Sequence, residues 1–329
     1  NIHGSPINGS FLGPFSTIDL TTMRDCVIGA FSYIQAGEVN HLKIDPGTVW
    51  VRNPGAFNFL YRYPVDRLND YIYFAEGFPP RGIFIDFVEG RKKDFEQIFN
   101  LLNIERPASV PESSSLNRFS VIKPKTHISE NVLVAQRACL ENAWLGKGAN
   151  VQEQCYIINS RLEGFDITAH GAKIIEAVLG KNVFVGFNSF LRGQPKSRLT
   201  VGQDTIIMPH TIIDSKKPLA VPEGHLVWGL VTNKNDLEVN SIPLDSLSKV
   251  KTTLSKGNMI FEGSGAGFVS AFKERIHHIL EENGAFFDGK ANRGHAQRNQ
   301  SISFNTLQPY PKGDKEGLYP TIMIQSYLK

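Results

Sequence analysis

The chain has 329 residues, of which 41% are hydrophobic and 20% are charged, and its 35 basic residues nearly balance its 32 acidic ones. This composition is typical of a globular protein and excludes a disordered or fibrous one. The small basic excess argues against a nucleic-acid partner, because such proteins gather basic residues into a dense patch. The sequence contains no run of roughly 18 apolar residues of the kind that crosses a membrane, so we also expect no membrane partner.

The three cysteines, Cys26, Cys139 and Cys155, are odd in number and show no CxxC spacing. This pattern favours buried free thiols over a disulfide framework. Free thiols are typical of a reducing compartment, and we therefore expect a cytoplasmic protein.

Residues 1–52 introduce a repeat in which an aliphatic residue recurs every six positions, often followed by glycine or another small residue. Two of these hexapeptides are Leu12-Gly-Pro-Phe-Ser-Thr and Ile28-Gly-Ala-Phe-Ser-Tyr. A period of six suits short extended segments joined by sharp turns, because the small residue lets the backbone bend while the aliphatic residue points inward. Three such segments close one triangular coil. We expect the coils of a β-helix to begin here.

Residues 53–118 interrupt the repeat with an aromatic-rich insertion. One helix is predicted within it, because Phe95, Ile98, Phe99 and Leu102 follow the spacing of an amphipathic helix face. Insertions into stacked repeats lie on one face and often form a binding rim, and a purely structural cap is the alternative.

Residues 119–232 return to the repeat and form the predicted main β-helix. Three of its hexapeptides resemble one another: Leu145-Gly-Lys-Gly-Ala-Asn, Val185-Gly-Phe-Asn-Ser-Phe and Val201-Gly-Gln-Asp-Thr-Ile. A β-sandwich would instead show apolar and polar residues alternating with a period of two. The register is most disturbed between Leu162 and Leu179. Stacked coils bury their aliphatic faces collectively. The predicted inward positions are Ile128, Val134, Leu140, Leu145, Val151, Leu179, Val185, Leu191, Val201, Ile207, Ile213, Val221 and Val227.

Residues 233–329 are predicted to form C-terminal helices and a tail. A short helix is expected over 244–254, opened by Pro243. A second helix is indicated by the apolar stripe from Phe268 to Leu280, with Gly284 placed as its C-terminal cap. A final strand is expected within 319–327.

These repeats resemble the hexapeptide-repeat superfamily of acyl- and acetyltransferases, whose pattern is an aliphatic residue, a small residue, two free positions, a small residue and a free position. The resemblance covers roughly residues 10–52 and 125–232. It implies a mainly β fold, a left-handed parallel β-helix with an inserted α/loop segment and C-terminal helices. It also implies a homo-oligomer, most often a homotrimer.

The resemblance implies transfer of an acyl group from a CoA-type thioester, acyl-CoA or acetyl-CoA, to a sugar, a nucleotide sugar or an amine. Such a reaction needs a base and a donor for the oxyanion. His170 and His210 lie in short sequence segments that are similar to family sites, and they are the candidate catalytic residues. His170 is preferred because it lies where the register is most disturbed, with Asp166 and Glu176 as carboxylates that could orient it. A corner residue bonded to a backbone carbonyl is the alternative for each histidine.

Further site residues follow from the same resemblance. Coenzyme A phosphates are expected near basic residues of late coils, and a solvated loop is the alternative for each of these. Candidate substrate ligands are polar residues that a corner would expose. The cofactor candidates are Lys196, Arg198, Lys216 and Lys217, and the substrate candidates are Asn188, Ser189, Arg192 and His225.

Two other functions remain open. A γ-carbonic-anhydrase-like enzyme would bind a metal through three histidines, two of them five apart in one coil, and the wide spacing of His127, His170 and His210 offers no such pair. No metal is therefore expected. The second alternative is a non-catalytic oligomerisation or regulatory module of a sugar-nucleotidyltransferase-like protein, since a fold alone does not fix the chemistry.

Overall fold

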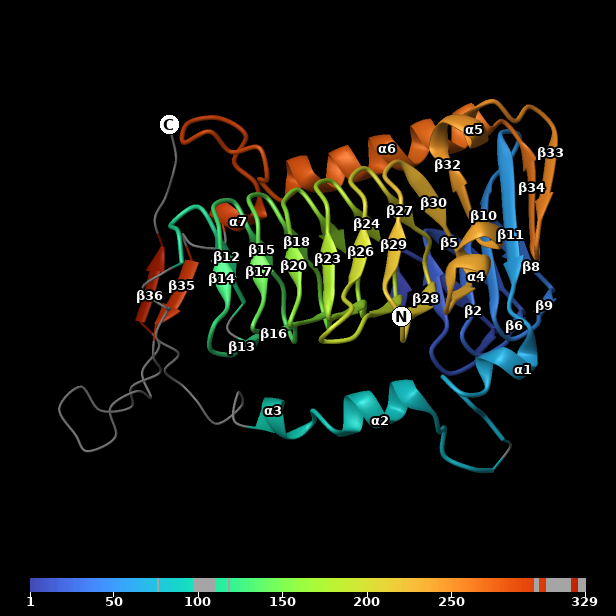
Figure 1. Cartoon of the computed structure of the whole chain (residues 1–329), viewed down its shortest axis with the longest axis horizontal. Helices are drawn as coiled ribbons and strands as arrows, with labels where there is room; N and C mark the ends of the chain where they lie inside the picture. Colours follow the sequence, from blue (N-terminus) through green and yellow to red (C-terminus); the bar gives the residue numbers. More distant parts are fainter. Residues whose placement is uncertain (76, 97–109, 118, 299–301, 306–320, 325–329) are drawn as a thin grey trace.

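The computed structural model describes residues 1–75, 77–96, 110–117, 119–298, 302–305 and 321–324. Within these residues the protein is mainly β and forms a left-handed parallel β-helix (Figure 1), as the resemblance to the hexapeptide-repeat superfamily implies. None of the helices in this part of the chain is long and apolar enough to cross a membrane. Cys26, Cys139 and Cys155 are buried free thiols, as predicted.

The main β-helix has three walls, each a sheet in which a strand pairs with the strand one coil later. Wall 1 contains β12 (Ser115–Leu116), β15 (Leu133–Val134), β18 (Asn150–Val151), β21 (Ile167–Thr168), β24 (Phe184–Val185), β27 (Ile206–Ile207), β30 (His225–Val227) and antiparallel β32 (Ser241–Pro243). Wall 2 contains β13 (Val121–Ile122), β16 (Cys139–Glu141), β19 (Tyr156–Ile158), β22 (Lys173–Ile175), β25 (Phe190–Arg192), β28 (Ile212–Asp214) and β31 (Leu230–Val231). Wall 3 contains β14 (His127–Ile128), β17 (Trp144–Leu145), β20 (Arg161–Leu162), β23 (Ala177–Leu179), β26 (Leu199–Val201) and β29 (Leu219–Val221).

Columns of aliphatic side chains fill this β-helix. In wall 2 the strand register stacks Leu140, Ile157, Ile174 and Leu191, and none of the four is exposed. All of the predicted inward positions lie in the same buried cluster. The expected irregularity between Leu162 and Leu179 is wrong, because β21 and β22 continue the coils in register. The aliphatic pattern is interrupted in the sequence because the polar residue Thr168 takes an inward position of wall 1.

The N-terminal coils form a second, shorter β-helix with its own buried interior of Ile18, Ile28 and Ile34. Among the described strands, none of these coils shares a sheet with the main β-helix, so the expectation of a tube that simply begins here is corrected. One face contains β1 (Ile2–His3), β4 (Thr17–Asp19), β7 (Tyr33–Gln35) and β10 (Thr48–Asn53). The other two faces contain β2 (Ile7–Asn8), β5 (Thr21–Arg24) and β8 (Gly37–Asn40), and β3 (Phe11–Leu12), β6 (Val27–Ile28) and β9 (Lys43–Ile44).

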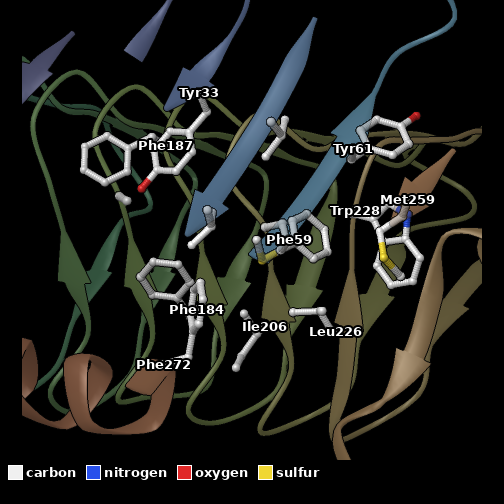
Figure 2. Packing of buried hydrophobic residues seen from close by; sticks show 14 of the residues in the cluster. Tyr33, Phe59, Tyr61, Phe184, Phe187, Ile206, Leu226, Trp228, Met259 and Phe272 are labelled. Carbon is white, nitrogen blue, oxygen red and sulfur yellow. The ribbon is translucent and has the colours of Figure 1, made fainter. Parts of the chain in front are cut away.

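A shared apolar layer holds the two β-helices against each other. The first face of the short β-helix is extended by the antiparallel strands β11 (Phe57–Arg62), β34 (Met259–Gly263) and β33 (Thr253–Lys256). Figure 2 shows this layer from close by: Tyr33 lies beside Phe187 of the main β-helix at 5.9 Å, and Phe184 lies 6.2 Å from Phe272. These side chains belong to one buried cluster, which supplies the hydrophobic stabilisation of the contact.

In the part of the chain that the structure describes, helices lie along walls 1 and 2 (Figure 1). α6 runs along wall 1, as its contact through Phe272 shows, and α2 packs on wall 2, where Phe84 lies 5.1 Å from Phe190. Wall 3 carries the exposed Trp144. The helices are α1 (Val65–Leu68), α2 (Ile83–Glu89), α3 (Lys93–Glu96), α4 (Lys234–Val239), α5 (Leu244–Ser248), α6 (Gly265–Glu282) and α7 (His295–Arg298).

The predicted helices and strand of the insertion and tail have different outcomes. The helix at Phe268 to Leu280 is confirmed as α6. The helix over 244–254 is wrong beyond α5, because Leu254 lies in β33, paired with β34. The insertion helix through Leu102 lies mostly outside the described residues. Within 319–327 the structure has β36 (Thr321–Ile324), paired antiparallel with β35 (Ile302–Asn305).

An ion pair also fastens the short β-helix to α6. Asp19 is fully buried, and its Oδ2 accepts hydrogen bonds from Arg275 Nη2 at 2.8 Å and from the Tyr33 hydroxyl at 2.5 Å. Burial alone would raise the pKa of Asp19, but the Arg275 charge and the hydrogen bonds outweigh it and hold that pKa below its ordinary value. The carboxylate is therefore charged in the folded protein.

Replacing Ile174 with Ala tests the inner columns. It should lower the free energy of unfolding by about 2–5 kcal/mol, because it leaves a cavity that the rigid stack cannot close. The matched control Thr200→Ala, at an exposed position of β26, should change it by less than about 0.5 kcal/mol. Urea unfolding followed by circular dichroism measures both. Equal effects at the two positions would contradict the packing described.

Replacing Asp19 with Asn tests the ion pair. The variant should lose about 3–5 kcal/mol at pH 7, because it leaves the Arg275 charge partly buried without a partner. The folded pKa of Asp19 lies below the value of about 3.9 in an unfolded chain, so its contribution is present above that pH and lost as the pH falls through the folded pKa. The exposed Asp25→Asn control should cost at most about 1 kcal/mol. A penalty for Asp19→Asn that does not shrink in acid would count against the pair.

Candidate functional site

The corner between walls 1 and 2 brings chemically active side chains from successive coils into one column. Val151, Thr168 and Val185 pair in register along wall 1, and two residues after each of them stand Glu153, His170 and Phe187. We call the column Glu153, His170 and Phe187 the dyad corner. The next residue of these coils, Gln154, Gly171 or Asn188, has left-handed backbone geometry, which makes the turn sharp.

Glu153 and His170 form a carboxylate–histidine pair on this corner. Glu153 Oε2 lies 3.0 Å from His170 Nδ1, and the His170 side chain is 27% exposed. The imidazole stacks on Phe187, with ring centroids 5.1 Å apart and planes 9° apart. Burial lowers the pKa of His170, while the Glu153 charge opposes that shift. The ring is therefore neutral near pH 7, as a proton-accepting base must be.

A second carboxylate–histidine pair reaches the same place from the short β-helix. His3 Nδ1 lies 2.7 Å from Asp19 Oδ1, and the His3 side chain is 46% exposed. The ring centroids of His3 and His170 lie 5.6 Å apart, and His3 also lies 5.8 Å from Phe187. Docking of the two β-helices thus brings together two histidines, each with a carboxylate at Nδ1.

His210, the other predicted catalytic histidine, has a different setting. It takes the left-handed position of its turn and is fully buried. Its Nδ1 lies 3.2 Å from the Phe31 carbonyl and its Nε2 lies 2.9 Å from Thr17 Oγ1, so both ring nitrogens are satisfied by the short β-helix. Burial lowers the pKa of His210 to about 3. The ring is a neutral link between the two β-helices, which is the corner role that the sequence left open.

The predicted substrate ligands are spread over several places. Asn188 donates to Thr17 Oγ1 at 2.9 Å and lies nearest to the dyad corner. Ser189 is fully buried and donates to a backbone carbonyl of the next coil, so it serves the interior and not a substrate surface. Arg192 binds Asp214 through two hydrogen bonds of 2.9 and 2.6 Å on wall 2. His225 is half-buried on wall 1, bonded to the carbonyl of residue 223.

The four predicted cofactor residues gather at another corner, between walls 2 and 3. Lys196 and Arg198 lie in the turn between β25 and β26, and Lys216 and Lys217 lie in the turn between β28 and β29. The two turns are adjacent because β25 pairs with β28 and β26 pairs with β29. All four side chains are exposed, although Arg198 Nε is 3.6 Å from Glu176. The structure brings these residues together but not to the dyad corner.

Two cavities lie near corners of the main β-helix. One of about 370 Å³ is lined by Gln154, Gly171 and Asn188, which follow the dyad corner residues along the chain, and by Lys173 among others, but not by the dyad corner residues themselves. Burial lowers the pKa of Lys173 to about 8. The other, of about 720 Å³, lies between α6 and the corner of walls 3 and 1, and its lining contains none of the ten predicted site residues.

The sequence analysis did not identify Glu153 as the partner of His170, and it did not identify the pair of His3 and Asp19. Asp166 and Glu176, expected to orient His170, are engaged elsewhere: Asp166 accepts from backbone N–H groups, and Glu176 accepts from Asn159. Aligning the coils one above another would have placed Glu153 beside His170. Among the described residues, no group of three or more His, Cys, Asp or Glu side chains is arranged to hold a metal ion.

Comparison with known proteins agrees with the fold. A family model for a hexapeptide repeat including loop matches residues 1–76. A crystal structure described as a "putative acetyltransferase" from Desulfovibrio desulfuricans G20 is 48% identical with a TM-score of 0.87, covering 99% of this chain and 68% of that chain. No curated protein matches the sequence significantly.

Other solved structures are more distant. A hexapeptide transferase family protein from Anaplasma phagocytophilum is 17% identical with a TM-score of 0.24, covering 38% of this chain and 82% of that chain. UDP-N-acetylglucosamine acyltransferase from Campylobacter jejuni is 14% identical with a TM-score of 0.27, covering 70% of this chain and 72% of that chain. Neither of these two likenesses bears on the chemistry. On the strength of the 48% identity over nearly its whole length, the chain belongs to the hexapeptide-repeat superfamily of acyl- and acetyltransferases.

Proposed function

We propose that this protein is an acyltransferase that moves an acyl group from a CoA-type thioester to a small-molecule acceptor, with His170 as its base. The observation that carries the proposal is the Glu153–His170 pair, partly exposed at a coil corner of a chain in this superfamily. Family membership supports the thioester donor, acetyl-CoA or a longer acyl-CoA. The acceptor belongs to the sugars, nucleotide sugars or amines.

The proposal gives each group of the pair a role. The free nitrogen of His170, Nε2, takes a proton as the acceptor attacks the thioester carbonyl carbon. The Glu153 carboxylate beside Nδ1 stabilises the imidazolium that forms, which is the orienting role of a carboxylate in such pairs. When the carbon–sulfur bond breaks, the imidazolium returns its proton to the departing thiolate. The protons and electron pairs therefore balance over the reaction.

The basic corner of Lys196, Arg198, Lys216 and Lys217 is the proposed site for the phosphates of coenzyme A. Its support is the adjacency of two turns that together expose four cationic side chains, which attract phosphate strongly. We also propose a cytoplasmic homotrimer, because the superfamily forms trimers and because the three buried thiols suit a reducing compartment.

Replacing His170 with Gln tests the base. With acetyl-CoA and a panel of sugars, nucleotide sugars and amines, thiol release should fall by about 10²–10⁴-fold, because the amide accepts no proton. Acetyl-CoA affinity, measured by calorimetry, should stay unchanged. The matched control His127→Gln, at an exposed ring stacked on Trp144, should keep full activity. Unaltered turnover in His170→Gln would exclude this base, and absence of both acetyl-CoA binding and thiol release would refute the proposed function.

Replacing Glu153 with Gln tests the carboxylate. The Glu153 charge raises the pKa of His170, so its removal should move the acidic limb of the rate–pH profile to lower pH. The maximal rate should also fall, because the imidazolium loses its counter-charge. Steady-state kinetics between pH 5 and pH 8 measure both, and an unshifted acidic limb would show that Glu153 does not act on His170.

A further inference from the structure

The proposed function uses one histidine, yet the structure presents two. We propose that His3, held by Asp19, is a second proton acceptor of the same site, and that the acceptor substrate is therefore a primary amine. The proposal rests on the proposed function and deepens it. It follows from the placement of the His3 and His170 rings 5.6 Å apart, each with a carboxylate at Nδ1.

The carboxylates decide where the ring protons sit. A carboxylate only accepts hydrogen bonds, so the Nδ1 atoms of His3 and His170 carry the protons of the neutral rings. The lone pair of each ring then lies on Nε2. Phe187 contacts both rings, stacked on His170 and tilted against His3, and so fixes the two together. The site thus presents two proton-accepting nitrogens that come from two different β-helices.

Charged groups from several elements face His3. Asp19 faces His3, but its charge is shared with Arg275 of α6 and with the Tyr33 hydroxyl. Across the junction lie His170 and its partner Glu153. Asp19 shares its charge with Arg275, and its other oxygen lies 2.7 Å from His3 Nδ1, so it orients the ring and fixes the tautomer of the neutral form.

Two proton-accepting histidines match the two protons that a primary ammonium ion loses when it is acylated. A primary amine enters at neutral pH as an ammonium ion and loses two protons during acylation, whereas a hydroxyl group loses one. His3 takes the first proton and frees the nitrogen lone pair, which forms the carbon–nitrogen bond at the thioester carbonyl. His170 takes the second and returns it to the thiolate as the carbon–sulfur bond breaks. His3, the more exposed of the two rings, releases its proton to water.

The test compares His3→Gln with wild type in the thiol-release assay from pH 7 to pH 10. Acetyl-CoA is the donor, and the acceptor probes are matched pairs such as glucosamine with glucose, free and linked to UDP. Wild type should acetylate the amino compound of a pair and not the hydroxyl compound. His3→Gln should be slow at pH 7 and recover by about tenfold for each pH unit up to the pKa of the amine, because only amine that is already deprotonated can react.

Three controls test whether this recovery of activity at high pH comes from the loss of the His3 proton acceptor. His41→Gln alters another histidine of the short β-helix, one that lies 3.7 Å from Asp25, and should match wild type at every pH. His170→Gln should not recover in alkali, because its missing base acts after the ammonium is deprotonated. Thermal unfolding of His3→Gln should match that of His41→Gln, which separates a lost proton acceptor from a damaged fold.

The outcomes that overturn the inference differ from those that overturn the function. The inference fails if thiol release depends on His170 but His3→Gln behaves like wild type, or loses the same factor at pH 7 and pH 10. It also fails if hydroxyl probes alone are acylated. Stoichiometric zinc in wild type that both His3→Gln and His170→Gln lose would overturn it too, since a ligated nitrogen accepts no proton. Absence of any acetyl-CoA binding and turnover would instead remove the proposed function itself.

Discussion

The contact between the two β-helices is the constraint on which the site depends. Each β-helix is stable in shape because its aliphatic columns allow little repacking, so each presents its corner residues at fixed positions. The aromatic layer and the Asp19–Arg275 pair then set how the two rigid bodies meet. Because His3 and His170 come from different bodies, their separation of 5.6 Å is a property of this contact and of neither β-helix alone.

The two predicted catalytic histidines show how burial decides chemistry. His170 and His210 lie at the same corner of the tube, one residue apart in the repeat, and the family resemblance offers both as candidate bases, with His170 preferred. His210 faces the short β-helix, is fully buried and has both nitrogens engaged, so it cannot exchange protons with a substrate. His170 precedes the left-handed residue of its turn, which leaves its ring at the edge of the contact with a carboxylate beside it.

The fold was largely predictable because an inward position in a coil accepts few side chains. The predicted hexad residues of the main β-helix, such as Leu191, are all buried, and those of the short β-helix are buried, as Ile28 is, or partly buried, as Leu12 is. Thr168 shows the limit, since one polar residue in a column made a continuous tube look interrupted. Glu153 was within reach of sequence reasoning, because it stands one coil before His170 in register.

The remaining parts of the site could not be read from the sequence. His3, Asp19 and Arg275 lie in two distant segments, and no local pattern records that an N-terminal coil will dock beside α6. The aromatic residues of the insertion gave the only hint, because so many large apolar side chains need a surface to cover. That surface consists of the outer faces of walls 1 and 2 together with the short β-helix.

The direct test of this account is the position of the ring protons. Nitrogen-15 NMR of the protein near pH 8 distinguishes a neutral imidazole protonated at Nδ1 from one protonated at Nε2, with His3→Gln and His170→Gln used to assign the signals. The account predicts the Nδ1-protonated form for both His3 and His170, with the two Nε2 lone pairs free. Protonation at Nε2 in either ring would contradict it, because the site would then lack its pair of proton acceptors.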